Sequence, residues 1–314
     1  MGTILSIVFP LYAAIAIGYG AVRLGAFKPS DMRVLGHYVL SIALPALVFH
    51  AIATRDIAEV LQPAYLMVYA AGGLATIAVA FAWFTFTAPD KRRRAVAVMG
   101  CACPNSGFIG YPLLLLLFPD LAGLVLAQNV LVENVLLIPL CLVLMDLAED
   151  RESVSVPAML GRVLRDLLRR PLIVGLLAGL AVSALGIPLP GPVNRLFEML
   201  AASASALALV VIGGTLVGLP MFGNRAMAAQ IALGKLLMHP ALTTVAALVL
   251  TGVGLVVLPP DLRAAVILSA AMPMFGVYTI FAQERGLEGA ASLAQLMATS
   301  GAFLSLSALL LWLA

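Results

Sequence analysis

Long continuous apolar stretches, separated by short polar segments, fill this chain from end to end. A bilayer core about 30 Å thick needs a helix of about 20 apolar residues, and ten stretches approach or exceed that length. They are rich in Leu and Ala and lack the alternation of polar and apolar positions that is typical of membrane β-strands. The pattern therefore predicts ten transmembrane helices, with approximate limits Thr3–Leu24, Met32–Ala53, Ala64–Phe86, Ala95–Phe118, Ala122–Met145, Pro171–Ile187, Phe197–Leu219, Ala228–Leu258, Leu262–Gln283 and Ala291–Leu313.

The composition excludes a water-soluble globule. Of 314 residues, 63% are hydrophobic and 11% charged, and the mean hydropathy is +1.10, whereas soluble domains average about 45–50% apolar and about 25% charged residues. The net charge of +3 does not indicate nucleic-acid binding, because Lys and Arg occur in short scattered clusters rather than on one basic face. Cys101, Cys103 and Cys141 all lie in apolar stretches, and their spacing fits neither a disulfide framework nor a metal site. We expect no metal and no other cofactor.

The basic residues predict how the chain is oriented, because cytoplasmic loops are enriched in Lys and Arg. Fourteen of the 18 lie in or beside the odd-numbered connections, and the even-numbered connections hold only Arg55, Arg195 and Arg263. We therefore expect both termini on the periplasmic side. Residues 151–170 become a cytoplasmic linker between a first unit of five helices, residues 1–150, and a second, residues 171–314. An odd number of helices in each unit makes the second inverted relative to the first.

Inverted repeats are common among secondary transporters, and the fourth and ninth segments carry a matching irregularity. Pro104 is followed by Gly107 in the fourth segment, and Pro273 by Gly276 at a similar depth in the ninth. Proline interrupts a helix, and interruptions at membrane depth occur where protein or a water-filled cavity satisfies the freed backbone groups. Matched interruptions in both halves indicate a substrate site. The alternative is a simple bend, which is what we expect at Pro45, Pro139 and Pro240.

The electrostatics of these interruptions favour an anion. A helix that restarts after Pro104 has unpaired N–H groups at residues 106–108 and about half a positive charge at its start, and the ninth segment would do the same from the opposite direction. Asn105 adds amide donors, and the glycines let a ligand approach the backbone. A small organic anion with a carboxylate suits such a site. The predicted substrate-binding residues are Pro104, Asn105, Ser106, Gly107, Pro273, Met274 and Gly276.

Polar residues within other segments are candidates for coupling transport to an ion. Glu133 lies at the centre of the fifth segment, where an ionised side chain costs about 2.5–3.5 kcal/mol, so we expect it to be protonated, paired or facing a wet cavity. Asn129 and Asn134 extend this patch toward the fourth segment. Lys235 and His239 lie one turn apart in the eighth. We expect Lys235 to extend to the cytoplasmic interface and His239 to form a helix-to-helix hydrogen bond or titrate near neutral pH.

The fourth segment, from Pro104 to Pro112 (PNSGFIGYP), resembles the helix 4 motif of the auxin efflux carrier family. Residues 44–49, 133–140 and 235–240 agree with the same family, and residues 272–286 look most like its bacterial malonate-transporter branch. The resemblance covers the whole chain. Two departures bear on the substrate: Gly36 and His37 stand where family members commonly carry Asn, and Met274 and Phe275 stand where plant relatives carry a polar residue.

The resemblance implies an all-α integral membrane fold of two inverted five-helix repeats, similar to bile acid and sodium/proton transporters. It implies a scaffold of helices 1, 2, 6 and 7 and a mobile transport domain of helices 3–5 and 8–10, in which the broken helices 4 and 9 cross. It also implies elevator-type alternating access, a homodimer, and contact between Asn105 and the substrate carboxylate.

We therefore expect a secondary transporter for a small organic anion in a bacterial inner membrane. Anion uptake against the membrane potential costs about 2.3 kcal/mol per 100 mV and charge, so uptake needs co-transported cations and export does not. Glu133 and His239 favour protons as the co-transported cation. Sodium is the alternative, because a sodium site built from backbone carbonyls leaves no signature in the sequence. The alternatives are a sodium-coupled bile-acid-like symporter, a cation/proton antiporter and an intramembrane enzyme. The antiporter normally uses aspartates in the middle of the membrane, and no Asp lies deep in these segments. The enzyme would use Ser106 as nucleophile, and no histidine stands at a spacing that supports it.

Overall fold

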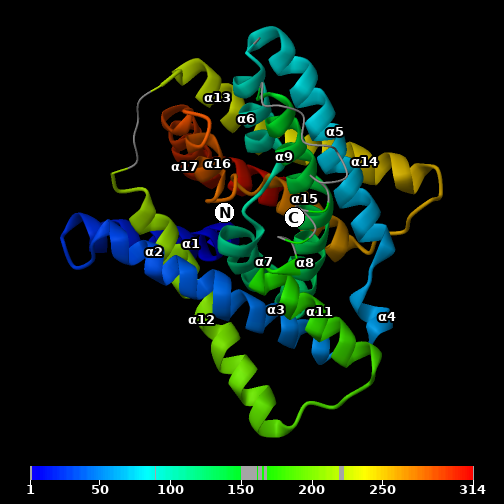
Figure 1. The fold of residues 1–314 in the computed structure, drawn as a ribbon. Coiled ribbons are helices and arrows are strands. Elements are labelled where there is room, and N and C mark those ends of the chain that lie inside the picture. The colour runs from blue at the N-terminus through cyan, green and yellow to red at the C-terminus, as the bar shows by residue number, and fades with distance from the viewer. Residues whose placement is uncertain are drawn as a thin grey trace.

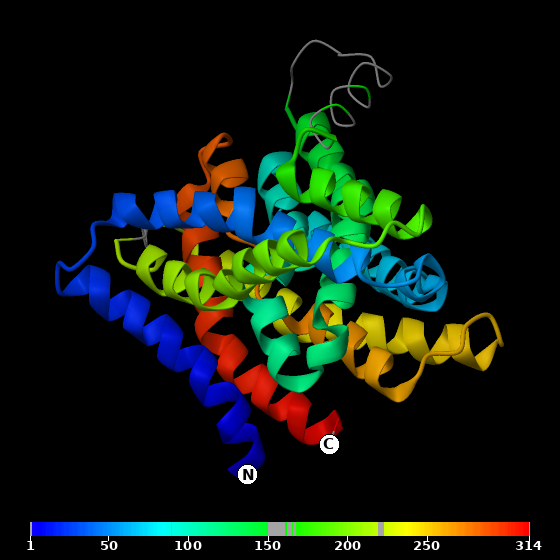
Figure 2. The ribbon, with the colours of Figure 1, turned by 90° about the horizontal axis from the view of Figure 1, so that it is seen from below.

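The computed structural model describes residues 2–88, 90–149, 161, 165, 168–218 and 223–313. Within these ranges the chain is helical and contains no β-strand, apart from one isolated antiparallel bridge. Most of the expected linker at 151–170 and the expected end of the seventh segment at Leu219 lie outside the described residues. The start of α1 and the end of α17 lie near each other, on the side away from the end of α9 and the start of α11 (Figures 1 and 2).

The first half of the chain contains long helices and several shorter ones, and its described residues include three π-helical turns, labelled η. In order they are α1 (Gly2–Arg23), α2 (Pro29–Tyr38), η1 (Val39–Ala43), α3 (Leu44–Ala53), α4 (Ile57–Val60), α5 (Pro63–Thr87), α6 (Lys91–Ala102), η2 (Ser106–Gly110), α7 (Tyr111–Leu117), α8 (Pro119–Val132), η3 (Glu133–Leu137) and α9 (Ile138–Leu147).

The second half has a similar succession of elements and ends in the longest helix. In order they are α11 (Pro171–Ala184), α12 (Gly191–Thr215), α13 (Arg225–Leu233), η4 (Gly234–Met238), α14 (His239–Gly252), α15 (Pro260–Ala271), α16 (Tyr278–Gln283) and α17 (Glu288–Leu313).

Six continuous helical runs among the described residues have the length and composition of membrane spans: Pro29–Ala53, Pro63–Thr87, Pro119–Leu147, Gly191–Thr215, Arg225–Gly252 and Glu288–Leu313. Ser106–Leu117 and Pro171–Ala184 are shorter apolar helices. Large apolar side chains such as Phe86 and Trp312 lie on the outer surface, where a bilayer would cover them. The chain is therefore a multi-pass membrane protein, and the count of ten spans stays a prediction.

Four π-helical turns precede four prolines at one constant spacing. Each turn spans five residues, and the proline is the second residue of the α-helix that follows: Pro45, Pro112, Pro139 and Pro240. A proline ring clashes with the carbonyl four residues earlier and donates no hydrogen bond. A π turn contains one extra residue, so its backbone hydrogen bonds span five residues instead of four and the proline is accommodated there. Pro45, Pro139 and Pro240, where we expected simple bends, therefore each follow a wide π turn. Two of these turns contain predicted coupling residues: Glu133 lies in η3 and Lys235 lies in η4.

Helices from the two halves pack against each other at glycines. α1 packs on α12, α3 on α11, and α5 on α14. A Cβ atom added to Gly213 of α12 would lie 1.8 Å from the carbonyl oxygen of Ile15 in α1, and one added to Gly72 of α5 would lie 2.4 Å from Oγ1 of Thr243 in α14. Small residues allow such close approach between membrane helices, where packing rather than the hydrophobic effect drives association.

Candidate functional site

The predicted break in the fourth segment is present. α6 ends at Ala102 and η2 begins at Ser106, with extended backbone between them. Asn105 is buried and starts the second helix, because its side-chain Oδ1 accepts a hydrogen bond of 3.1 Å from the Phe108 N–H. Its carbonyl accepts a further bond of 2.9 Å from the Gly110 N–H.

The ninth segment is broken as well, and the two breaks bind each other. α15 ends at Ala271 and α16 begins at Tyr278. Pro104 and Met274 form an antiparallel bridge, in which the Asn105 N–H donates to the Pro273 carbonyl at 2.8 Å and the Phe275 N–H donates to the Cys103 carbonyl at 3.3 Å. We call residues 103–105 and 272–277 the two interruptions. Their pairing satisfies backbone groups that lipid could not satisfy.

Backbone N–H groups remain unpaired on both sides of this bridge. Among the described residues, the N–H groups of Ser106, Gly107, Gly276 and Val277 donate to no protein acceptor. The Asn105 side-chain nitrogen also has no acceptor there. The expectation of a free N–H at Phe108 is wrong, because the Asn105 side chain accepts from it. Free backbone N–H groups at a helix start are the kind of donor that binds anions in other proteins.

The two predicted glycines differ in their surroundings. A Cβ atom added to Gly276 would meet no atom within 4 Å, so a ligand has room to approach that backbone. One added to Gly107 would lie 2.8 Å from Cδ1 of Leu44, so Gly107 permits close packing against α3. The six residues of α16 also give it a weaker dipole than the 12-residue run Ser106–Leu117. The described cavities of about 440 and 460 Å³ lie elsewhere, and no residue of the two interruptions lines them.

Glu133 contacts the restart of the fourth segment directly. Its Oε1 accepts a hydrogen bond of 2.5 Å from Ser106 Oγ and another of 2.6 Å from the Tyr69 hydroxyl. All three side chains are buried. We call Glu133, Ser106 and Tyr69 the Glu133 cluster; it joins η3, η2 and α5. Of the three expectations for Glu133, protonated, paired or facing a wet cavity, the structure shows partners: each of the two hydroxyl donors compensates part of the cost of burying the carboxyl group.

The two asparagines near Glu133 have separate partners. Asn129 Oδ1 accepts from the Tyr65 hydroxyl at 2.7 Å, and its Nδ2 donates to Ser269 Oγ at 2.9 Å, which links α8 to α15 just before the second interruption. Asn134 instead accepts from Arg170 at 2.7 Å and donates to the Val130 carbonyl. The prediction of one patch containing both is therefore wrong for Asn134, since one residue corresponds to about 100° of helix rotation from Glu133.

Lys235 holds the end of α15. Its side chain is 0% exposed, and its Nζ donates to the Ala270 carbonyl at 2.6 Å and contacts His239 Nδ1 at 2.9 Å. The expectation that Lys235 extends to the interface is wrong, because the last carbonyls of α15 carry a partial negative charge that attracts the ammonium group. The helix-to-helix hydrogen bond expected for His239 is also wrong: its bond lies within one helix, and its Nε2 has no partner among the described residues.

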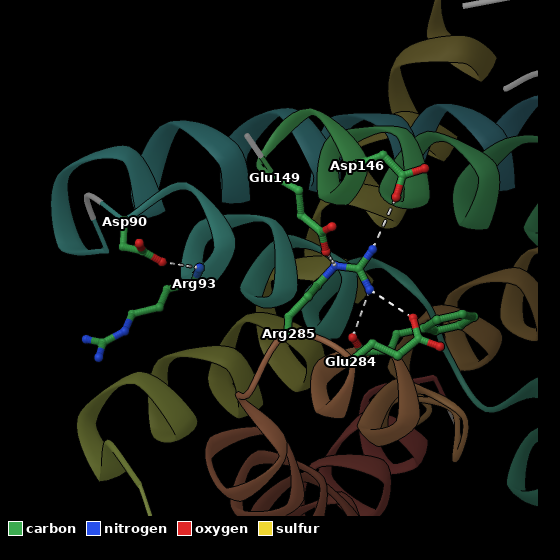
Figure 3. A network of polar contacts seen from close by, with 7 residues as sticks. Asp90, Arg93, Asp146, Glu149, Glu284 and Arg285 are labelled. Atoms are coloured by element: carbon green, nitrogen blue, oxygen red, sulfur yellow. Dashed lines mark hydrogen bonds and ion pairs between the residues drawn. The ribbon is translucent and has the colours of Figure 1, made fainter. Parts of the chain in front are cut away.

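A further polar cluster, at the end of α16, was not predicted (Figure 3). The Arg285 side chain is buried and forms ion pairs with Asp146 at 3.2 Å, Glu149 at 3.5 Å and Glu284 at 3.2 Å. Asp146 and Glu149 follow the fifth segment, so Arg285 joins the ends of α9 and α16. One signal was available: Arg285 is the only basic residue between the ninth and tenth segments, and acidic residues end the fifth.

Tyr65, Tyr69 and Ser269 were also missed. The two tyrosines lie one turn apart in the third segment, a spacing that places both hydroxyls on one helix face. Their sequence shows the shared face but not the buried acceptors on another helix, because those lie 64 residues away along the chain.

The fold is a set of apolar helices, and the fourth and ninth segments are interrupted and paired with each other beside buried polar clusters. These features are typical of an integral membrane protein of the transport class. The chain belongs to the Membrane transport protein family, which includes the auxin efflux carriers, and the family model matches residues 3–313. It is a transporter and not an enzyme.

Named relatives come from bacteria and plants. The chain is 28% identical over 247 residues to a protein of Rhizobium meliloti (strain 1021) named "Putative malonate transporter", a match that covers 77% of this chain and 76% of that protein. It is 26% identical over 148 residues to auxin efflux carrier component 2 of Arabidopsis thaliana, covering 46% of this chain and 23% of the plant protein. The corresponding carrier of Oryza sativa subsp. japonica is 27% identical over 162 residues, covering 48% and 26%.

Proposed function

We propose that this protein is a secondary transporter that binds a small organic anion at the two interruptions and carries it across a bacterial inner membrane. One observation carries the proposal: the interruptions pair through Pro104 and Met274, with unpaired N–H groups on either side of the bridge. Backbone N–H groups at a helix start bind carboxylates and phosphates. The side-chain nitrogen of Asn105 adds a donor beside the same helix start, and the space at Gly276 admits a ligand.

The packing between the two halves supports an inverted repeat. If helices 1–5 correspond to helices 6–10, the pair α1–α12 (helices 1 and 7) corresponds to the pair α11–α3 (helices 6 and 2), and both pairs pack together. The pair α5–α14 (helices 3 and 8) and the pairing of the two interruptions (helices 4 and 9) each correspond to themselves. Such self-consistency favours the predicted repeat with a crossing of helices 4 and 9 at its centre.

The same pairs support a division into two moving parts. Helices 1, 2, 6 and 7 contribute α1, α3, α11 and α12, which pack mainly on one another. The interruptions and the Glu133 cluster belong to helices 3–5 and 9, which with helices 8 and 10 would form the transport part. Elevator movement of that part against the scaffold would carry the bound anion across, and a homodimer would anchor the scaffold. Both termini would face the periplasm.

The substrate class is a small mono- or dicarboxylate. The name of the Rhizobium meliloti relative makes malonate the first substrate to test, and an auxin-like acid the second. An anion entering an inside-negative cell works against about 2.3 kcal/mol per 100 mV and charge, so accumulation needs a coupled cation.

Two contacts favour a proton over sodium as that cation. Sodium sites in broken-helix transporters use carbonyls at the end of a half-helix, and here the ammonium group of Lys235 already donates to the Ala270 carbonyl at the end of α15. Glu133, by contrast, is a buried carboxyl group whose donor Ser106 follows Asn105 directly. A proton on Glu133 would change the charge next to the anion site.

The test is uptake of labelled malonate into proteoliposomes with an imposed pH gradient, an imposed sodium gradient, or neither. Accumulation with the pH gradient alone is expected. Accumulation with sodium alone would favour the sodium-coupled symporter. Absence of flux and exchange for malonate, succinate and indole-3-acetate would contradict the proposed substrate class.

A further inference from the structure

A groove on the outside of the protein lies between α5 and α13. It has a volume of about 460 Å³ and is lined mainly by apolar side chains, including Trp83, Phe84, Leu233, Leu237 and Met238. Gly234 of η4 and Cys101 of α6 also line the groove and pack closely on each other: a Cβ atom added to Gly234 would lie 2.6 Å from the Cys101 sulfur. No larger residue fits at that position without displacing the sulfur.

Most of the lining of this groove comes from two candidate membrane spans, Pro63–Thr87 and Arg225–Gly252. Trp83, Leu233 and Leu237 are 55%, 57% and 57% exposed, so they form an exposed apolar surface that lipid would cover. The Trp83 indole N–H donates to Gln230 Oε1 at 3.0 Å, which satisfies the polar atom of Trp83 at the groove. Most of the remaining lining is hydrocarbon, so an acyl chain suits the groove.

Positive charge gathers at one end of the groove. Residues 91–94, Lys-Arg-Arg-Arg, begin α6, and Arg225 begins α13; we call these five the basic cluster. The end of α5 and the starts of α6 and α13 lie at the same end of the molecule (Figure 1). The Arg94 guanidinium lies 4.8 Å from the centre of the Phe81 ring and donates to Thr85 Oγ1, so it lies along α5 beside the groove.

The basic cluster has no acidic partner within the described ranges of the chain. Among the residues that the structure describes, none of its five side chains forms an ion pair, and the Arg93 guanidinium points away from Asp90, which accepts from the Arg93 backbone (Figure 3). Arg285, on the neighbouring helix ends, is surrounded by three carboxylates. The charges of the cluster are therefore available to an external anion.

We propose that this groove and the basic cluster together bind an anionic phospholipid, with an acyl chain in the groove and the phosphate at Arg94 and its neighbours. This surface complements a lipid of one leaflet: the groove matches a long apolar chain, and the basic cluster matches an anionic head group. Basic residues beside grooves between membrane helices bind anionic head groups in this way. The lipid site is separate from the two interruptions, so it does not depend on which anion is transported.

Trp83 lies in the groove and reports on the lipid directly. The chain has two tryptophans, and Trp312→Phe leaves Trp83 alone. The variant is reconstituted into phosphatidylcholine and phosphatidylglycerol bilayers of one composition, with brominated acyl chains on one lipid or the other. Bromine quenches indole fluorescence on contact. We expect quenching per brominated molecule to be about twofold stronger when phosphatidylglycerol carries the bromine. Equal quenching in both mixtures would overturn the proposal.

Charge variants identify the head-group contact. Arg94→Gln in the same background is expected to make the two mixtures equal, whereas Arg263→Gln, which removes an exposed charge at the start of α15, should keep the difference. Loss of the difference in Arg263→Gln as well would indicate a general charge effect and overturn the site. Inorganic phosphate should not reduce the difference, and if it did, the basic cluster would be a site for a soluble anion instead. Unchanged Trp83 emission without bromine checks folding.

Discussion

The Ser106 hydroxyl donates a hydrogen bond of 2.5 Å to Oε1 of Glu133, although 27 residues separate them. Ser106 opens the helix that follows the first interruption, and Glu133 lies in the π turn of the fifth segment. The charge on the buried carboxyl group therefore acts one residue away from Asn105. A proton that binds to Glu133 and an anion that binds at Asn105 would stabilise each other, which is the thermodynamic requirement for coupled transport.

Glu133→Gln is expected to abolish accumulation driven by a pH gradient while leaving exchange of labelled for unlabelled malonate intact. The amide oxygen of Gln still accepts hydrogen bonds from Ser106 and Tyr69, but the side chain binds no proton at neutral pH. Both assays use the same proteoliposomes. Glu198→Gln, at an exposed carboxylate of α12, is the matched control and should retain both activities. Accumulation by Glu133→Gln at the wild-type level would exclude Glu133 from coupling.

Two substitutions at Asn105 separate its structural role from ligand binding. Asn105→Asp keeps an oxygen that caps the Phe108 N–H but brings a negative charge to the anion site, so the Kd for malonate should rise about tenfold, or about 1.4 kcal/mol. Asn105→Ala, in contrast, removes the capping oxygen as well as the amide donor, and it should lower the free energy of unfolding by about 1 kcal/mol. Calorimetric titration and thermal unfolding in detergent measure both. An Asp variant with unchanged affinity would place the anion elsewhere.

The interruptions could be predicted from the sequence because their cause is local. At 104 and at 273 the proline removes a backbone donor whatever surrounds it, and the glycine three residues later gives the chain the freedom to leave the helix. The matching depth of the two prolines even indicated that the breaks belong together. The π turns were not predicted, because a proline shows that a helix must deviate but not whether it bends or widens.

The partners of the buried polar residues could not be predicted from the sequence. Lys235 was expected to extend toward the cytoplasm because its depth along the helix is readable, while the side of the helix facing Ala270 is not. Tyr69 and Glu133 were visible as polar residues in separate segments, but their contact depends on how α5 packs on η3. Such contacts arise from tertiary packing between distant segments. Helical periodicity shows which residues share a face of one helix, but it does not show which other helix packs on that face.

Lys235→Met is expected to lower the free energy of unfolding by about 1–3 kcal/mol, because it leaves the buried Ala270 carbonyl without its donor. Thermal unfolding in detergent measures the change. Thr244→Val is a matched control: it removes a hydrogen bond to a carbonyl of its own helix at a half-buried position, so its effect should be smaller. A Lys235→Met protein as stable as the wild type would show that the ammonium group does not hold the end of α15.

The ion pairs of Arg285 should stabilise the protein to different extents, and the pair with the more buried carboxylate should contribute more. The Glu149 side chain is 14% exposed and that of Asp146 is 51% exposed. Water screens the exposed pair, so Asp146→Asn should cost within about 0.5 kcal/mol, while Glu149→Gln should cost more. Arg285→Gln affects all three pairs and should cost about 1–2 kcal/mol, less than a fully buried pair because water reaches the carboxylates left behind.

The same variants test whether Arg285 fixes α16 to α9. If it does, Arg285→Gln and Glu149→Gln should slow malonate exchange in the order of their stability losses, because α16 begins where the second interruption ends. Arg285→Lys keeps the charge but not the planar fork that reaches several carboxylates at once, so its exchange rate should lie between the wild type and Arg285→Gln. Equal rates in all four proteins, with the stability order intact, would show that the cluster holds the helix ends together without influencing transport.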